Sequence, residues 1–356
     1  MPLSKIQTTS NQVIPNLGRR NLIINGAMQI AQRGTSSTSD SYQTVDRTRT
    51  NHGGASVTQS QQTLTSGSPY NEGFRYFLRV TNTSASSATS ANMQLLQFIE
   101  AQNISGSGWN YTSSSSNVTF SCWVRSSLAG TYMFRLRTFD GTSYAYASKF
   151  TLLADTWTKI TKTIPGNSNL QFDNDNGSGL EVNITPHFGT NFTDSGFTDD
   201  AWGAYSSSSR SDDFDQNWCN TVNATFDTTA WQLEVGDSAS DFEHRSFGEE
   251  LALCQRYYQA KGAGSGYYAG NGVSTNQIAC GFPLATSMRA TPSTPPNVSV
   301  HRSGNQSVTA SINQISLGYS NDIGSNCQVR FLGFSVTDEV AYNVALNGVL
   351  RLDSEL

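Results

Sequence analysis

The chain has 356 residues and a formal net charge of −5, and it is 36% hydrophobic, 14% charged and 11% aromatic. This length gives room for two domains, and the aromatic content excludes a disordered chain, so the Ser-, Thr-, Asn- and Gly-rich remainder predicts a folded β-protein with a polar surface. The sequence holds no basic cluster beyond Arg19-Arg20 and no apolar run of membrane-spanning length, which argues against a nucleic-acid surface, a membrane span and a signal peptide.

The first 20 residues carry no periodic pattern long enough for a core element. Pro2, Pro15 and Gly18 interrupt them. Segments of this kind are either plain disordered tails or arms that become ordered against a partner. Both interpretations stay open from the residues alone.

Residues 21–245 are expected to form a jelly-roll β-sandwich. Short runs of alternating apolar and polar residues follow one another, with turn signals such as Asp140-Gly141 between them and no helical pattern among them. This rhythm is typical of sandwiches and jelly rolls. The alternation assigns ten residues to the core: Phe120, Cys122, Val124, Phe134, Leu136, Ile160, Val182, Ile184, Trp231 and Leu233.

Residues 189–220 break this rhythm and form a long loop rich in Ser, Asp and aromatic residues. Long loops in compact domains are often functional. Aromatic rings can stack on the apolar faces of sugars while polar neighbours bind the hydroxyls. The loop residues Trp202, Tyr205 and Trp218 are therefore candidate glycan contacts. The strand residues Trp123, Tyr144 and Tyr146 are weaker candidates, because one face of each sheet in a sandwich is buried.

A single convincing helix is predicted at Gly248–Gln259, after the strand that contains Trp231. Ser246 and Glu249 form a capping box at its start. The apolar residues of this segment form two stripes at helical spacing rather than one: Leu251, Cys254 and Tyr258, then Leu253 and Tyr257. Because one stripe can pack on the helix's own domain, the other needs a second surface, either an oligomer axis or the next domain. Residues 246–356 are expected to hold this helix and a second, smaller β-domain that oligomerises.

No catalytic spacing stands out, so we expect a protein that is not an enzyme. Glu243-His244 invites an acid–base interpretation, but a role in fixing the interdomain link, with Arg245 as partner, is favoured.

The five cysteines lack a CxxC pair and predict buried free thiols. Asp173-Asn174-Asp175-Asn176-Gly177 carries oxygen ligands at alternating positions. However, Ile184 stands where a calcium loop needs its final acid, which favours a polar hairpin tip and no metal site.

Two blocks of sequence resemble a known family. The run from Gln232 to Tyr258, QLEVGDSASDFEHRSFGEELALCQRYY, is similar to a junction in tail-fibre and other virion-surface proteins of marine and cyanobacterial phages. The blocks Arg20–Met28, Gln32–Thr35 and Val45–Arg47 resemble the start of the same proteins. The resemblance implies a jelly roll like the carbohydrate-binding modules of glycoside hydrolases. We assign no cofactor from the residues. Such modules often hold a structural calcium, so the resemblance leaves a structural calcium site as an alternative.

The resemblance implies a virion structural protein that is made in the host bacterial cytoplasm. A tail fibre or tail-tip adhesin that binds host-surface glycan is one expectation, and a capsid decoration or head-fibre protein is the alternative. In either case the N-terminal arm would dock on other virion proteins. The chain would assemble with itself, as a homotrimer like other fibres.

Overall fold

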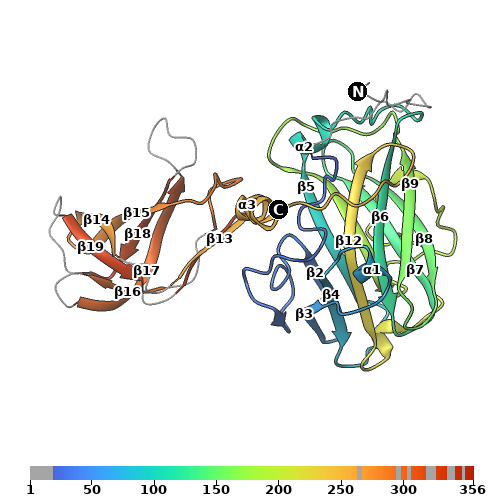
Figure 1. Ribbon diagram of the computed structural model, residues 1–356, viewed down its shortest axis with the longest axis horizontal. Coiled ribbons are helices and arrows are strands. Elements are labelled where there is room, and N and C mark those ends of the chain that lie inside the picture. The colour runs from blue at the N-terminus through green and yellow to red at the C-terminus, as the bar shows by residue number, and fades with distance from the viewer. Residues whose placement is uncertain are drawn as a thin grey trace, which may run out of the picture.

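The computed structural model describes residues 19–262, 267–293, 298–302, 306–317, 326–334, 341–346 and 349–356. Within these ranges the chain is all-β, as predicted, with a jelly-roll sandwich, a short helix and a smaller β-barrel (Figure 1). Most of the predicted arm, residues 1–18, lies outside the described residues. Among the described residues, no helix is long and apolar enough to span a bilayer.

Two six-stranded antiparallel sheets make the sandwich, in the orders β1-β3-β4-β12-β6-β9 and β11-β8-β7-β10-β5-β2. The first sheet consists of β1 (Ser36–Ser37), β3 (Val57–Thr63), β4 (Tyr76–Asn82), β6 (Asn117–Ser126), β9 (Thr158–Pro165) and β12 (Thr225–Val235). The second consists of β2 (Arg49–Gly53), β5 (Asn92–Glu100), β7 (Gly130–Thr138), β8 (Tyr144–Leu152), β10 (Ser178–Phe188) and β11 (Trp202–Ala204). Three short helices lie in the connections: α1 (Ser68–Asn71), α2 (Ala101–Ser105) and η1 (Trp218–Asn220).

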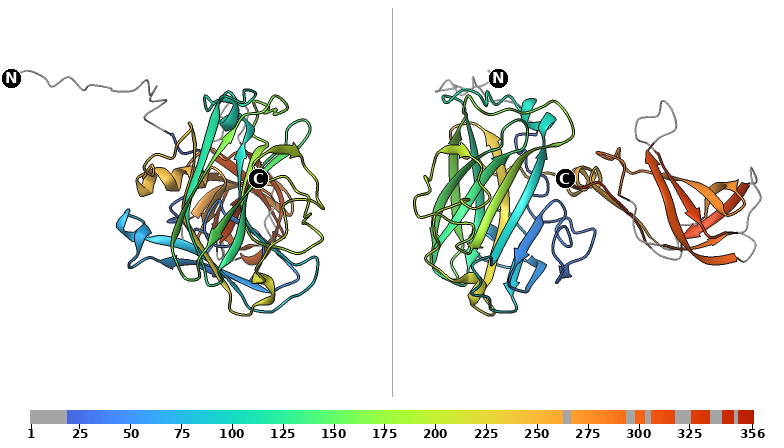
Figure 2. Two further views of the ribbon diagram at one scale, coloured as in Figure 1. Left: turned by 90° about the vertical axis from the view of Figure 1, so that its right-hand side faces the viewer. Right: turned by 180° about the vertical axis from the view of Figure 1, so that it is seen from behind.

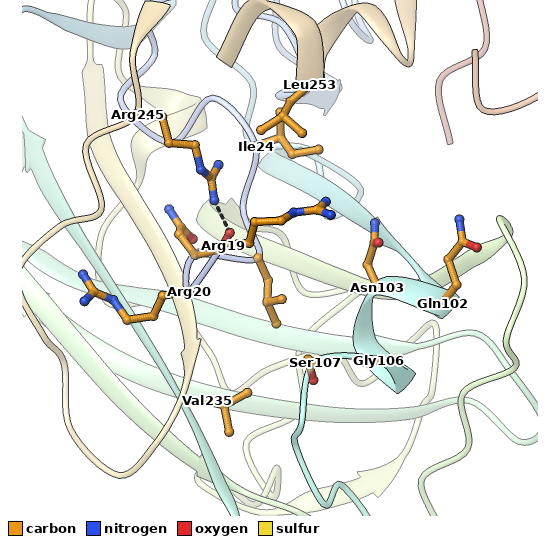
Figure 3. A pocket seen from close by; sticks show the side chains of 12 residues that line it. Arg19, Arg20, Ile24, Gln102, Asn103, Gly106, Ser107, Val235, Arg245 and Leu253 are labelled. Carbon is orange, nitrogen blue, oxygen red and sulfur yellow. Dashed lines mark hydrogen bonds between the residues drawn. The ribbon is translucent and has the colours of Figure 1, made fainter. Parts of the chain in front are cut away.

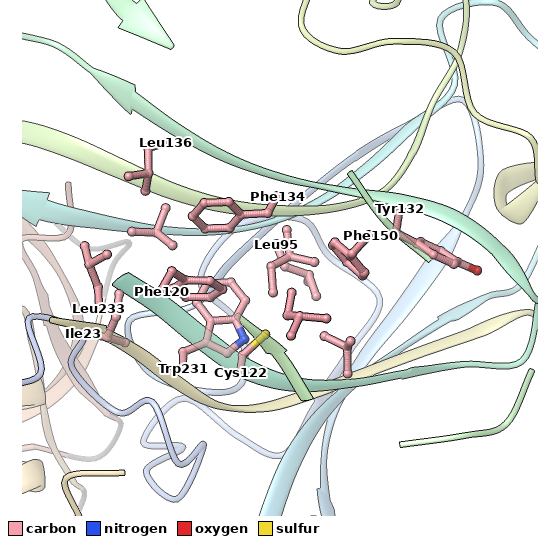
Figure 4. Packing of buried hydrophobic residues seen from close by; sticks show 14 of the residues in the cluster. Ile23, Leu95, Phe120, Cys122, Tyr132, Phe134, Leu136, Phe150, Trp231 and Leu233 are labelled. Atoms are coloured by element: carbon pink, nitrogen blue, oxygen red, sulfur yellow. The ribbon is translucent and has the colours of Figure 1, made fainter. Parts of the chain in front are cut away.

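The sandwich core lies between the inner faces of the two sheets. All ten residues that the alternation assigned to it belong to one buried cluster, so this prediction is confirmed. Phe120 stacks on Phe134 with ring centroids 4.5 Å apart and meets Trp231 edge-on at 5.9 Å (Figure 4). Such aromatic contacts add to the hydrophobic stabilisation that burial gives.

The helix after the sandwich, α3 (Phe247–Gln255), is shorter than predicted. Its N-terminus has the expected capping box between Ser246 and Glu249. Its C-terminus does not reach Gln259, because the chain turns at Arg256 and continues as a strand from Tyr258. The rings of Tyr257 and Tyr258 lie under the guanidinium groups of Arg47 and Arg33, at 3.4 Å and 3.7 Å. These contacts and the strand pairing override the helical spacing of the two tyrosines.

The C-terminal part forms a closed six-stranded barrel, which the sequence predicted only as a small β-domain. Its strands are β14 (Tyr267–Ser274), β15 (Gln277–Pro283), β16 (Val298–Arg302), β17 (Gln306–Leu317), β18 (Asn326–Leu332) and β19 (Ala341–Leu346). A two-stranded ribbon, β13 (Tyr258–Lys261) and β20 (Leu350–Asp353), leads into and out of the barrel. Figure 2 shows that α3 and this ribbon lie between the sandwich and the barrel.

Buried charges fasten the ribbon and the chain end to the sandwich. Arg47 is fully buried, donates to the Phe98 carbonyl at 2.6 Å and pairs with Glu355. Arg33 pairs with Asp353 at 2.8 Å and with Glu355 at 3.4 Å. Because an unpaired charge in such a place would be costly, these pairs specify how the ribbon docks.

The predicted free thiols are confirmed: all five cysteines are buried and none forms a disulfide. Cys254 is the only one on α3, where it faces the junction and is 1% exposed. Leu251 and Leu253 are half-buried, while Phe247 at the start of the helix is 61% exposed. The helix therefore lies at the domain junction with part of its apolar surface uncovered in a single chain.

Candidate functional site: a groove on the outer face of one sheet

The outer face of the β11-β8-β7-β10-β5-β2 sheet carries rows of mainly polar and charged side chains. Side chains alternate along a strand, so Phe134 and Leu136 of β7 face the core while Arg135 and Arg137 face outward. The strand register then aligns outward residues across the sheet. Two such rows are Arg137–Glu181–Phe98 and Arg135–Asn183–Leu96–Arg49.

A chain of hydrogen bonds fixes the floor of this face. Arg135 Nη2 donates to Glu181 Oε1 at 2.7 Å, and Asn183 Nδ2 donates to the same oxygen at 3.1 Å. Asn183 also donates to Gln94 Oε1 at 3.1 Å and accepts from Thr185 at 2.9 Å. All five side chains are buried. Because each is held by its neighbours, the floor is rigid before any ligand arrives.

The loop 189–220 forms one wall above this floor. Its short strand β11 pairs with the edge of β8, and the chain then turns so that the Tyr205 N–H donates to the Ser143 carbonyl at 2.8 Å. The Tyr205 ring lies 3.6 Å from the Arg137 guanidinium. Arg210 follows on the same wall and covers the ring of Phe192 at 4.4 Å. The loop thus brings an aromatic ring and a further arginine onto the outer face of the sheet.

Two adjoining hollows occupy this face, and Tyr205 and Arg210 line both of them. The hollow over the rows has a volume of about 310 Å³, and the one under the loop has about 430 Å³. Sizes in this range are usual for ligand pockets. We call the two hollows the outer groove. The lining residues used below are Arg49, Gln94, Phe98, Arg135, Arg137, Phe139, Glu181, Asp194, Trp202, Tyr205 and Arg210.

The groove is strongly basic at its centre. Burial lowers the pKa of Arg210, and the nearby charges of Arg135 and Arg137 lower that pKa further. Arg135 is 2% exposed, and its Nε and Nη1 have no hydrogen-bond acceptor among the described residues. A buried cation with spare donors is well suited to meet an oxygen-rich or anionic ligand.

The structure separates the predicted glycan contacts. Tyr205 lies where the two hollows meet, and Trp202 lines the larger one. Part of the Trp202 ring is occupied, because it packs 5.7 Å from Tyr146 and its Nε1 donates to the Pro165 carbonyl at 2.7 Å. Tyr144 is half-buried against the core cluster on the inner side of β8.

Three further aromatic candidates are corrected. Trp218 is 0% exposed, because η1 folds it into the main core. Trp123 and Tyr146 are also buried, at 8% and 5% exposure. None of these rings can present a face to a sugar in this structure.

Sequence reasoning missed the arginines of the groove. Arg49, Arg135, Arg137 and Arg210 come from three segments far apart in the chain, so a search for local basic clusters finds only Arg19-Arg20. The fold brings them into one patch, which corrects the expectation that no basic patch exists. The sequence did contain one signal for these arginines: in β7 two arginines alternate with apolar core residues and must therefore face outward.

A third hollow, of about 230 Å³, lies apart from the outer groove, between α2, α3 and residues 19–24 (Figure 3). Two of its three arginines are already engaged within the chain. Arg20 pairs with Glu234 at 3.2 Å, and Arg245 pairs with Glu243 at 2.9 Å and donates to the Asn21 carbonyl. These bonds fit a structural joint better than a ligand site.

Glu243 and His244 have the structural role that the sequence favoured. The Glu243 carboxylate accepts from the backbone N–H groups of Arg20 at 3.1 Å and Asn21 at 2.7 Å. Desolvation alone would raise the pKa of Glu243, but these bonds and Arg245 outweigh it and lower that pKa. His244 packs against the rings of Phe74 and Phe242. Glu243 thus holds the N-terminal segment against the link to α3, and His244 holds the same link against the sandwich.

The Asp173–Gly177 loop is a polar hairpin tip that meets the C-terminal part. Asp175 Oδ1 accepts from the Gly177 N–H at 2.9 Å, and Arg289 Nη1 donates to the Asn176 carbonyl at 2.9 Å. Among the described residues, no group of three His, Cys, Asp or Glu side chains is placed to hold a metal ion. The assignment of calcium therefore stays a possibility that the family resemblance alone implies.

No family model matches the chain, and no curated protein matches it. Similar solved structures include a carbohydrate-binding module described as CBM4, with 14% identity, a TM-score of 0.26 and coverage of 45% of this chain and 71% of that chain. TmCBM61 in complex with β-1,4-galactotriose has 8% identity, a TM-score of 0.29 and coverage of 60% and 97%. A cyclase from Fischerella sp. TAU has 9% identity, a TM-score of 0.34 and coverage of 61% and 96%. At these identities and TM-scores, none of them identifies a ligand or an activity for this chain.

Proposed function

We propose that the protein binds glycan in the outer groove. The observation that carries this proposal is the place of Tyr205, a half-buried ring where two hollows meet over a largely polar floor. A pyranose ring has an apolar face that stacks on such a ring and hydroxyl groups that bond to amide, carboxylate and guanidinium groups around it. Gln94, Glu181 and Arg137 supply all three kinds of group within the same groove.

A second feature supports a chain-like ligand. The two hollows adjoin, and together they cross the sheet from Arg49 on β2 to Asp194 beyond β11. An elongated groove binds several consecutive sugar units, so affinity should rise with the length of the oligosaccharide. The proposal is of binding without catalysis, because the groove's hydrogen-bonded carboxylate, Glu181, is committed to Arg135 and Asn183.

In its biological setting, we propose a phage virion protein that attaches to the host surface. The support is the sequence resemblance of Gln232–Tyr258 and of the N-terminal blocks to tail-fibre and virion-surface proteins. A tail fibre or tail-tip adhesin uses a glycan groove directly. A capsid decoration or head-fibre protein is the second candidate, since the resembling proteins occupy several virion sites.

The binding proposal is tested with the full chain on immobilised glycans and on whole host cells. Tyr205→Ala should weaken binding about tenfold, because a lost stacking contact of roughly 1.4 kcal/mol has that effect. Tyr76→Ala is the matched control, since Tyr76 is 37% exposed on the opposite sheet. Equal binding by Tyr205→Ala and wild type, or no binding by the wild type, would refute the proposal. Product analysis of the same glycans should show no cleavage.

The virion assignment has its own test. Immunogold labelling of particles should place the protein at the tail for the adhesin and on the capsid for the alternative. A chain that lacks residues 2–18 should fold but fail to join particles if the arm docks on other virion proteins. Normal incorporation of the shortened chain would contradict the docking role, and this segment lies outside the described residues.

A further inference from the structure

The outer groove gathers positive charge in a protein that is negative overall. Of the groove residues over the two rows, four are arginines and one is a glutamate, Glu181, which gives a net charge of +3. The whole chain has a net charge of −5. A neutral sugar does not require this excess, because hydroxyl groups bond equally well to uncharged amides.

Within the described part of the chain, only one of the four arginines forms an ion pair. Arg135 pairs with Glu181 at 2.7 Å. Among the described residues, Arg49, Arg137 and Arg210 have no ion-pair partner. Elsewhere in the sandwich, arginines of similar burial are paired, as Arg79 and Arg125 both are with Asp227. The unpaired charge is therefore concentrated in the groove.

Some guanidinium donors of the groove also remain free. The Nε and Nη1 atoms of Arg135 and the Nε atom of Arg49 are buried and have no acceptor among the described residues. Aromatic contacts orient two guanidinium groups of the groove, since Arg137 lies on Tyr205 at 3.6 Å and Arg135 lies 5.7 Å from the same ring. Planar guanidinium groups fixed in this way match the geometry of carboxylate and sulfate groups.

From these observations we propose that the outer groove selects anionic glycans, those that carry carboxylate or sulfate groups. This inference rests on the proposed glycan-binding function and names its substrate class. The carboxylate or sulfate would sit near Arg49, Arg137 and Arg210, with the uncharged sugar rings on Tyr205. Uronic-acid polymers and sulfated polysaccharides both offer this chemistry.

A glycan fits the groove better than a nucleic acid does. All four arginines line the hollow over the two rows, whereas the hollow under the loop is lined by Arg210 and by the acidic Asp194. Asp199 and Asp212 on the same loop form ion pairs with Lys149 of β8. A nucleic acid carries a phosphate on every residue and needs a continuous basic track. A glycan with more widely spaced charges can place its anionic groups on the arginines and neutral units elsewhere.

The experiment compares four probes on the full chain: polygalacturonate, a sulfated galactan, neutral galactan and single-stranded DNA. Either or both anionic glycans should bind at least about tenfold more tightly than neutral galactan in about 50 mM salt, and the preference should shrink in about 200 mM salt. Comparison of the first two probes shows whether carboxylate or sulfate is preferred. DNA should bind more weakly than the preferred anionic glycan.

Charge variants locate the effect. Arg137→Gln and Arg49→Gln should each reduce the ratio of anionic to neutral affinity about five- to tenfold, as expected for loss of one charge-assisted contact. Arg75→Gln is the matched control, because it removes the same charge from an exposed site outside the groove. Thermal unfolding of each variant checks that the fold is retained.

The two proposals fail in different ways. If no glycan of any kind binds, the glycan-binding function itself is wrong. If neutral and anionic glycans bind equally, only the anionic selectivity is wrong. The same conclusion follows if the groove variants and Arg75→Gln have the same ratio of anionic to neutral affinity. Binding of DNA at least as tight as that of the anionic glycans would replace the inference with a nucleic-acid surface.

Discussion

Replacement of Phe120 by alanine tests the packing of the sandwich most directly. Phe120 is 0% exposed, stacks on Phe134 at 4.5 Å and meets Trp231 at 5.9 Å. Its truncation removes the buried ring, leaves a cavity between the two sheets and breaks both aromatic contacts. A buried Phe→Ala change costs about 3–5 kcal/mol. For a domain of this size, each kcal/mol lowers Tm by about 2–4 °C, so the expected loss is about 6–20 °C.

The measurement is urea or thermal unfolding of the full chain, followed by tryptophan fluorescence. Trp231 lies beside the cavity and should report the transition of the sandwich. Phe120→Leu retains most of the volume and should lose clearly less stability than Phe120→Ala. Tyr76→Ala, which truncates an exposed aromatic residue, should lose less than about 1 kcal/mol. A loss below about 1 kcal/mol for Phe120→Ala would show that this face of β6 is not the core.

Three further predictions concern pH, the junction and assembly. Burial lowers the pKa of His187 from 6.5 to about 4, so its neutral form contributes stability above pH 6.5 that is lost as the pH falls to about 4. His187→Gln should reduce the loss of unfolding free energy between pH 6.5 and pH 4 by up to about 3 kcal/mol, as measured by unfolding titrations. If the unfolding free energies of the variant and the wild type fall in parallel over this range, the prediction is wrong. Glu243→Gln should cost about 1.5–3 kcal/mol of stability without changing glycan affinity; a selective loss of binding would instead give Glu243 a functional role. If α3 packs at a trimer axis, Leu251→Asp or Leu253→Asp should yield folded monomers in sedimentation, and an unchanged oligomer in both would place the contact elsewhere.

Alternation predicted the strands and the core of the sandwich well, because period-two patterns report directly which face of a strand is buried. Phe120, Cys122 and Val124 lie on the inner face of β6 for this reason. The capping box predicted the start of α3 equally well, since it depends on residues three apart. Local signals of this kind need no knowledge of distant partners.

The end of α3 could not be predicted from the same signals. Tyr257 and Tyr258 continue the helical spacing, yet each is held by an arginine that lies more than two hundred positions earlier in the chain. Trp218 was assigned to an exposed loop for a similar reason, because nothing in its neighbours shows that η1 turns it inward. In both cases tertiary contacts decided against the local pattern.

The groove was predicted only in part. Tyr205 stood out as an aromatic residue in a long polar loop. The arginines were invisible as a group, since β2, β7 and the loop become neighbours only through the sheet order. A charge patch that is built from distant strands can be predicted only when the strand register is known, and a single sequence does not provide that register.

The sequence blocks that carry the family resemblance have a physical explanation in the junction. Arg33 and Arg47 from the N-terminal blocks contact Tyr258 and Tyr257 from the later block. Glu243 of the later block holds the backbone of Arg20 and Asn21. These residues join the sandwich to α3 and the ribbon, and none of them lines the outer groove. The two blocks therefore encode the junction of this scaffold, and the ligand is decided by the groove.

The β13–β20 ribbon that carries the barrel determines which part of the chain can be replaced without disturbing the sandwich. Lys261 and Leu350 are direct partners in the β13–β20 pair, so the chain enters and leaves the barrel at adjacent points. After β20 the chain returns to the junction beside the sandwich, where the Ser354 N–H donates to the Tyr257 carbonyl at 2.8 Å. In topological terms the barrel is a cassette inserted at the tip of a hairpin that belongs to the body. Any folded unit whose ends lie about 5 Å apart could occupy that tip. The barrel can thus be exchanged as a module while the groove-bearing body and its docking ribbon are inherited unchanged.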